Sequence, residues 1–74
     1  MIKEIKYTLK NGVMGSCLTE DKEFLTKKQD GWDMIGFKEI GKKRNTWLPF
    51  GANVTNITIY EAETGRVMKT IFKA

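Results

Sequence analysis

Histidine is absent from the sequence, and cysteine and proline occur once each, as Cys17 and Pro49. Without histidine the chain lacks the side chain that most often serves as a general base near neutral pH. A single cysteine allows no internal disulfide, which is typical of proteins kept in a reducing compartment. These absences predict a protein that is not an enzyme, although an active site completed by a second subunit stays open.

Long apolar runs are also missing. No stretch approaches the roughly 20 apolar residues that a membrane helix needs. Charged residues interrupt the N-terminal segment from Lys3 onward, so it has no apolar signal-peptide core. We therefore expect a soluble, cytoplasmic protein with no membrane partner.

Recognisable metal and cofactor motifs are missing as well. The densest acidic cluster is Glu20, Asp21 and Glu23, and it lacks the ligand spacing of a calcium loop. Zinc needs about four cysteine, histidine or carboxylate ligands, and no convincing set can be assembled here. We expect no metal and no cofactor, and we interpret Cys17 as a small strand residue because free cysteine is usually buried.

The length and charge of the chain limit what it can be. Seventy-four residues make one domain, and a domain this small buries only about 60% of its unfolded surface. A homo-oligomer or a bound partner would therefore add useful stability. The formal net charge is +4, which modestly favours a polyanionic partner such as nucleic acid.

The first 18 residues read as a hairpin. Residues 1–10 alternate polar and apolar side chains, which is the period-two signal of a strand. Asn11-Gly12 follows, the dipeptide that best suits a two-residue type I′ turn. Such a turn predicts the cross-strand pairs Lys10 with Val13, Leu9 with Met14, Tyr7 with Ser16, and Ile5 with Leu18.

Residues 19–31 allow two interpretations. Thr19 can cap a short helical turn near residues 19–28, because acidic residues follow it at once. A turn at residues 19–22 followed by a strand near residues 23–28 fits equally well. Asp30-Gly31 then predicts another turn in either case.

The remainder of the chain predicts further strands. Residues 32–40 place Trp32 and Met34 on one face and Ile35 and Phe37 on the other, with Gly36 suggesting a bulge or a close backbone approach. Pro49 lacks a backbone donor, so the strand that begins at Thr46 should end there or lie at a sheet edge. An irregular turn is expected at residues 50–53. Strands are also expected at residues 54–61 and 66–72, with Gly65 between them in a left-handed conformation.

Short strands at roughly ten-residue spacing indicate an all-β protein. We expect a single domain, residues 1–74, built as a small antiparallel barrel or sandwich of about five to seven strands. Asp30-Gly31-Trp32, followed by Trp47-Leu48-Pro49-Phe50 and Val54, resembles the second half of a Src-homology-type barrel. That resemblance implies a barrel only, because the aromatic N-terminal motif that binds proline-rich peptides has no counterpart.

The most suggestive segment for function is a basic turn among aromatic residues. Lys42, Lys43 and Arg44 lie together between Phe37 and Trp47. Mobile cations bind phosphates, and aromatic rings on a sheet stack with bases. The candidate nucleic-acid-binding residues are Lys42, Lys43, Arg44, Trp47 and Phe37.

A plainer interpretation competes with this one. A basic turn also keeps a protein soluble and protects strand edges, and large aromatics in a thin core are usually buried. The sequence therefore predicts a non-catalytic binding module, with nucleic acid as one partner. The alternative is a protein-interaction module or a small assembly component, for example of a phage or mobile element.

Overall fold

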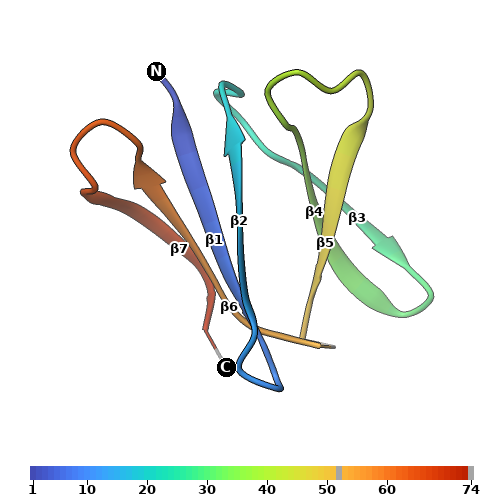
Figure 1. Ribbon diagram of the computed structural model, residues 1–74. Helices are drawn as coiled ribbons and strands as arrows, with labels where there is room; N and C mark the ends of the chain where they lie inside the picture. The colour runs from blue at the N-terminus through green and yellow to red at the C-terminus, as the bar shows by residue number, and fades with distance from the viewer. Residues whose placement is uncertain (52, 74) are drawn as a thin grey trace.

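A computed structural model describes residues 1–51 and 53–73, and it is all-β, with seven antiparallel strands in two sheets and no helix in these ranges (Figure 1). The four-stranded sheet has the order β2 (Met14–Thr19), β1 (Lys3–Leu9), β6 (Val54–Glu61) and β7 (Val67–Lys73). The three-stranded sheet has the order β3 (Leu25–Gln29), β4 (Trp32–Lys38) and β5 (Asn45–Phe50). The predicted fold class and strand number are confirmed.

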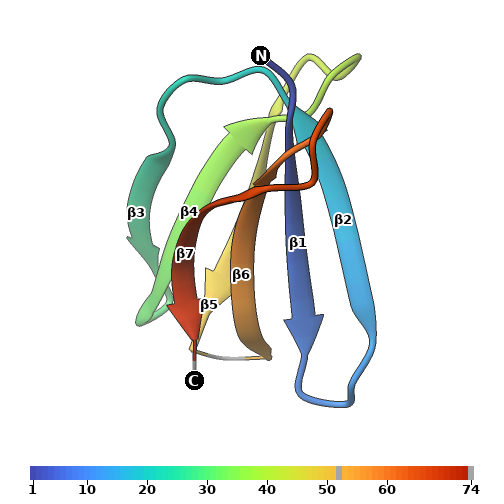
Figure 2. The same ribbon diagram turned by 90° about the vertical axis from the view of Figure 1, so that its left-hand side faces the viewer.

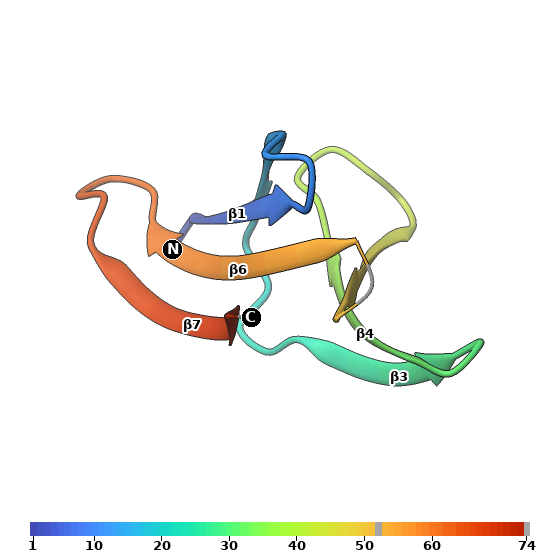
Figure 3. The ribbon, with the colours of Figure 1, turned by 90° about the horizontal axis from the view of Figure 1, so that it is seen from below.

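The two sheets meet where β2 ends beside the end of β4. The Ile40 N–H donates to the Leu18 carbonyl at 2.9 Å, and Thr19 forms an isolated bridge with Glu39. The Thr19 side chain is fully buried at this junction, and its hydroxyl donates to the Lys38 carbonyl at 2.7 Å. The edge strands β3 and β7 lie on the opposite side of the molecule from this junction (Figure 2, Figure 3).

The core lies between the sheets and is aliphatic apart from one ring. Phe37 is 0% exposed and packs edge to face against Phe24, with ring centroids 6.1 Å apart. Burying an aliphatic or phenylalanine side chain contributes about 1.5–3 kcal/mol relative to leaving it exposed. The buried hydrophobic residues are Ile5, Ile35, Phe37, Val54, Ile57 and Ile59.

The first hairpin forms as predicted, but its register is one residue away from the expected one. Tyr7 lies opposite Gly15, and Ile5 lies opposite Cys17. Gly12 adopts a φ of 87° while Asn11 does not enter the left-handed region, so the type I′ turn is wrong. The Leu9 N–H donates to the Val13 carbonyl and the Gly12 N–H to the Leu9 carbonyl, which is a three-residue loop with a bulge.

Gly15 gives the physical reason for this register. A Cβ atom at Gly15 would lie 2.2 Å from the Tyr7 ring, so the ring occupies space that only glycine leaves open. In the predicted register Tyr7 would have faced Ser16. The shift also turns Leu18 outward, where it is 45% exposed.

The structure decides between the two interpretations of residues 19–31. The helical turn is wrong, and a turn followed by strand β3 is confirmed. The Thr19 hydroxyl accepts the Asp21 N–H at 3.1 Å, so it closes a turn instead of capping a helix. Asp30 and Gly31 both have positive φ, 52° and 81°, so the tight turn with two left-handed residues lies here and joins β3 to β4.

The remaining sequence predictions are mostly confirmed. β5 is an edge strand, as Pro49 requires, and Gly65 adopts a φ of 73° between β6 and β7. Phe50 still belongs to β5, and position 52 of the expected irregular turn lies outside the described residues. Strand β7 departs from the expected alternation, because its register with β6 shifts twice, skipping Ile71 and Met68.

Candidate functional site

The outward-facing side of the three-stranded sheet combines aromatic and basic residues. Ile35 and Phe37 of β4 point into the core, so the alternate residues of that strand point outward. Residues opposite one another in the β3–β4 and β4–β5 ladders share a face. We call this the outer face, and its residues are Leu25, Lys27, Gln29, Trp32, Met34, Gly36, Lys38, Asn45, Trp47 and Pro49.

No acidic side chain occupies a strand position of the outer face, whereas Lys27 and Lys38 both do. The acids of this half of the chain lie elsewhere. Asp33 of β4 and Glu39, which directly follows β4, stand at positions that alternate with the outer-face residues. The Asp33 carboxylate forms an ion pair with the Lys28 ammonium at 3.7 Å. The strand positions of the outer face therefore carry two cations and no carboxylate, while the Asp21 carboxylate accepts the backbone N–H of Lys38 at 2.9 Å. The excess of positive charge at these positions favours an anionic partner.

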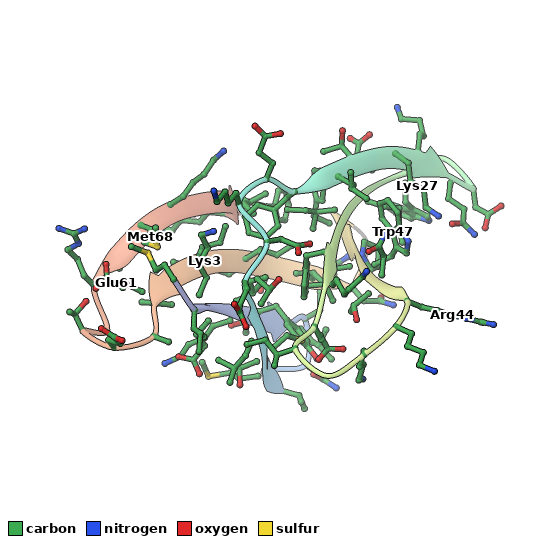
Figure 4. The ribbon with its side chains drawn as sticks, turned by 90° about the horizontal axis from the view of Figure 1, so that it is seen from above. Lys3, Lys27, Arg44, Trp47, Glu61 and Met68 are labelled. Atoms are coloured by element: carbon green, nitrogen blue, oxygen red, sulfur yellow. The ribbon has the colours of Figure 1, made fainter. Side chains whose placement is uncertain are left out.

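Trp47 is placed on this face by a glycine. Gly36 lies opposite Trp47 in the ladder, and a Cβ atom there would lie 2.6 Å from the indole ring. Gly36 therefore allows a close approach by the Trp47 side chain, whereas the sequence predicted a bulge or a close backbone approach. Above the ring lies the Lys27 ammonium, 4.1 Å from the ring centroid (Figure 4). This cation–π contact contributes about 0.5–1 kcal/mol at an exposed site.

Trp32 supplies a second aromatic surface. It opens β4 opposite Gln29 and is 46% exposed. An exposed tryptophan on a sheet offers a flat, rigid surface to a partner. Leu25 on the neighbouring strand is half exposed as well, so apolar surface extends across both strands.

Of the three residues of the basic turn, one forms an ion pair and two do not. Lys42 forms an ion pair with Glu39 at 3.0 Å, and the Glu39 carboxylate also accepts the Thr46 hydroxyl at 2.6 Å. Lys43 and Arg44 are exposed and have no ion pair among residues 1–51 and 53–73. Arg44 extends away from the loop into solvent (Figure 4).

The pKa values of this ion pair follow from the same contacts. The hydrogen bond from Thr46 lowers the pKa of Glu39 most, and the bond from Lys42 lowers it further. Glu39 in turn raises the pKa of Lys42. Both groups stay charged at neutral pH, so the charge of Lys42 is largely balanced by its neighbour.

The five residues proposed from the sequence therefore fall into three groups. Phe37 is fully buried and belongs to the core, so its prediction as a contact residue is wrong. Lys42 is held by Glu39, while Trp47, Lys43 and Arg44 are accessible on or beside the outer face.

Three outer-face residues, Trp32, Lys27 and Lys38, were not proposed from the sequence. The signal for Trp32 and Lys38 was present in β4 itself. Its period-two pattern puts Trp32 and Lys38 on the face opposite Ile35 and Phe37. Finding Lys27 required the pairing of β3 with β4, which the sequence left undecided.

Cys17 lies on the inward side of β2, half-buried and opposite Ile5. Burial raises the pKa of its thiol most, and the hydrogen-bonded Glu39 carboxylate raises it further, to about 11. The thiolate is the nucleophilic form of cysteine. Cys17 is therefore a poor nucleophile at neutral pH.

The part of the chain that the structure describes, residues 1–51 and 53–73, offers no metal site that we recognise. No group of three or more potential metal ligands is brought together there, and no helix there is long and apolar enough to cross a membrane. Comparison with protein-family models, curated proteins and solved structures finds no match.

Proposed function

We propose that this protein is a non-catalytic module that binds single-stranded nucleic acid on its outer face. The observation that carries the proposal is the composition of that face. It holds both tryptophans of the chain, Trp32 and Trp47, together with Lys27 and Lys38, and no acidic residue at a strand position.

Base stacking supplies the first part of the binding energy. An aromatic side chain that stacks on a base contributes about 1–3 kcal/mol, largely independent of which base it is. Trp32 is open to solvent on the rigid surface of β4. The Trp47 ring is covered by the Lys27 ammonium in the unbound protein, so a base that stacks there displaces Lys27 toward a phosphate.

Phosphate contacts supply the second part. The cations available without breaking an ion pair are Lys27, Lys38, Lys43 and Arg44. Each contact on a single strand contributes about −0.7 to the slope of log affinity against log salt, so four contacts give a slope of about −3. Binding should therefore weaken steeply as salt is added.

The experiment measures fluorescence anisotropy of a labelled 12-residue oligothymidylate at low salt. The double variant Lys38→Gln/Arg44→Gln should bind about tenfold more weakly or worse, and its salt slope should be shallower by about 1.4. The matched control is Lys10→Gln/Lys73→Gln, which removes the same charge from exposed positions outside the outer face.

The control separates a local site from a general charge effect. The proposal predicts that Lys10→Gln/Lys73→Gln keeps most of the affinity. Equal losses in both double variants, or no binding by the unaltered protein at low salt, would contradict it.

A protein partner is the second candidate, and strand β2 favours it. Residues 14–17, which precede the end of β2 that pairs with Ile40 and Glu39, carry no charged side chain on this outermost strand of its sheet, and Met14 is 68% exposed. Sheet edges without charge or proline are open to pairing with another strand. The partner would be a second copy or another protein, and sedimentation velocity tests the first case directly.

A further inference from the structure

A pocket of about 580 Å³ opens between the two sheets on the side bordered by β3 and β7. We call it the side pocket. Ile35 and Ile59 form its floor and belong to the core, and apolar walls are added by Phe24, Met68 and Ile71. Pockets that bind small molecules span about 300–1,000 Å³ and are mostly apolar, so the side pocket has a suitable size and lining.

Two bulges in β7 build the apolar wall. Thr58 and Ile57 of β6 lie opposite Thr70 and Phe72, which leaves Ile71 as the extra residue, and a second shift leaves Met68 extra. In a regular strand Met68 and Lys69 would point to opposite faces. Because bulges redirect side chains, Met68, Lys69 and Ile71 all line the pocket.

The polar residues of the side pocket are mostly basic. Lys3, Lys22 and Lys69 line it, against one carboxylate, Glu23. Lys3 donates a hydrogen bond to the Asp21 carbonyl, which holds its ammonium at the pocket (Figure 4). Lys22 and Lys69 have no ion pair in the described part of the chain. An apolar cavity with unneutralised ammonium groups matches a ligand with an apolar tail and an anionic head.

We propose that the side pocket binds a long-chain carboxylate, with its hydrocarbon tail against Phe24, Met68 and Ile71 and its head at Lys22 and Lys69. An added peptide strand is the other way to fill an open edge. Both edges here are protected against it, because β3 carries consecutive lysines, Lys27 and Lys28, and β7 is bulged twice. The side pocket shares no residue with the outer face. The proposal of ligand binding in the pocket is therefore independent of the proposal of nucleic-acid binding.

The test follows the methyl signals of Met68 and Ile71 by NMR while decanoate is added below its micelle concentration. Both signals should shift and saturate, while the methyl of Met14, on a distant strand, should not move. Octanoate should bind more weakly and dodecanoate more tightly, by about fourfold for each methylene that becomes fully buried. Unmoved Met68 and Ile71 signals would overturn the proposal.

The charge requirement is tested separately. Decanol, which has the same chain without the anionic head, should bind more weakly than decanoate, and Lys69→Gln should weaken decanoate by about threefold to fivefold. Lys73→Gln on the same strand is the matched control and should change little. Equal affinity for decanol and decanoate would overturn the role of the lysines, and methyl shifts produced only by an extended acidic peptide would assign the pocket to strand addition.

Discussion

Gly36 is the residue on which the position of Trp47 depends. The indole ring lies where a Cβ atom of residue 36 would be, 2.6 Å away, and the nearest atoms belong to a rigid ring instead of a flexible chain end. Glycine at this point therefore sets both the packing of β4 against β5 and the geometry of the outer face.

The substitution Gly36→Ala should destabilise the protein by about 1–3 kcal/mol, because overpacking a close contact forces side chains from their preferred rotamers. Urea unfolding measures the change. Ser16→Ala on an exposed stretch of β2 serves as the control and should stay within about 0.5 kcal/mol. A Gly36→Ala variant as stable as the unaltered protein would show that Trp47 can move at little cost.

Burial, and after it the neighbouring Glu39 carboxylate, keeps the Cys17 thiol protonated and unreactive. A thiol with a pKa of about 11 instead of 9.0 is ~100-fold less ionised at pH 8. Alkylation by iodoacetamide should therefore be about 100-fold slower in the folded protein than in the unfolded chain, measured by mass spectrometry with and without urea. Equal rates would mean that Cys17 is neither buried nor bonded to Glu39.

The same pKa has a consequence for stability. The folded state holds the Cys17 proton to higher pH than the unfolded chain does, so the native state binds more protons between about pH 9 and 11. The free energy of unfolding should therefore fall as pH rises through that window. Cys17→Ser, with a group that does not ionise there, should remove this part of the decline.

Among the strands, β2 offers a direct test of the protein-partner alternative. Ser16→Lys places a charge at the middle of this uncharged edge strand. Sedimentation velocity should show the unaltered protein as an oligomer and Ser16→Lys as a monomer if β2 is the contact. If the unaltered protein and Ser16→Lys are both monomers, β2 does not pair copies of this chain.

The strands also show how far local patterns reach. Alternation predicted strands β1, β4 and β6, and in β4 it placed Ile35 and Phe37 on one face. It did not identify that face as the buried one, because Phe37 was proposed as a contact residue and is fully buried. It failed in β7 and in the first hairpin. The bulges at Ile71 and Met68 and the fit of the Tyr7 ring over Gly15 depend on a neighbouring strand, which no single segment encodes.

For the molecule as a whole, composition and turn spacing predicted the all-β class and an upper limit of seven strands, and both are confirmed. The candidate site was predicted only in part. A run of basic residues drew attention to the turn at residues 42–44, whereas the outer face assembles Lys27, Trp32 and Trp47 from three strands by way of their register. The side pocket has no sequence signature, since its lining comes from five strands and from the segment at residues 22–24.

Intrinsic tryptophan fluorescence measures occupation of the outer face most directly, because both tryptophans of the chain, Trp32 and Trp47, lie there. Titration with unlabelled oligothymidylate at low salt should quench the emission to a plateau, since bases stack on both rings. Added salt should then restore the emission. The binding constant obtained from these titrations should fall with salt at a log–log slope of about −3. Emission that stays constant at low salt up to saturating oligonucleotide would contradict binding of nucleic acid at this face.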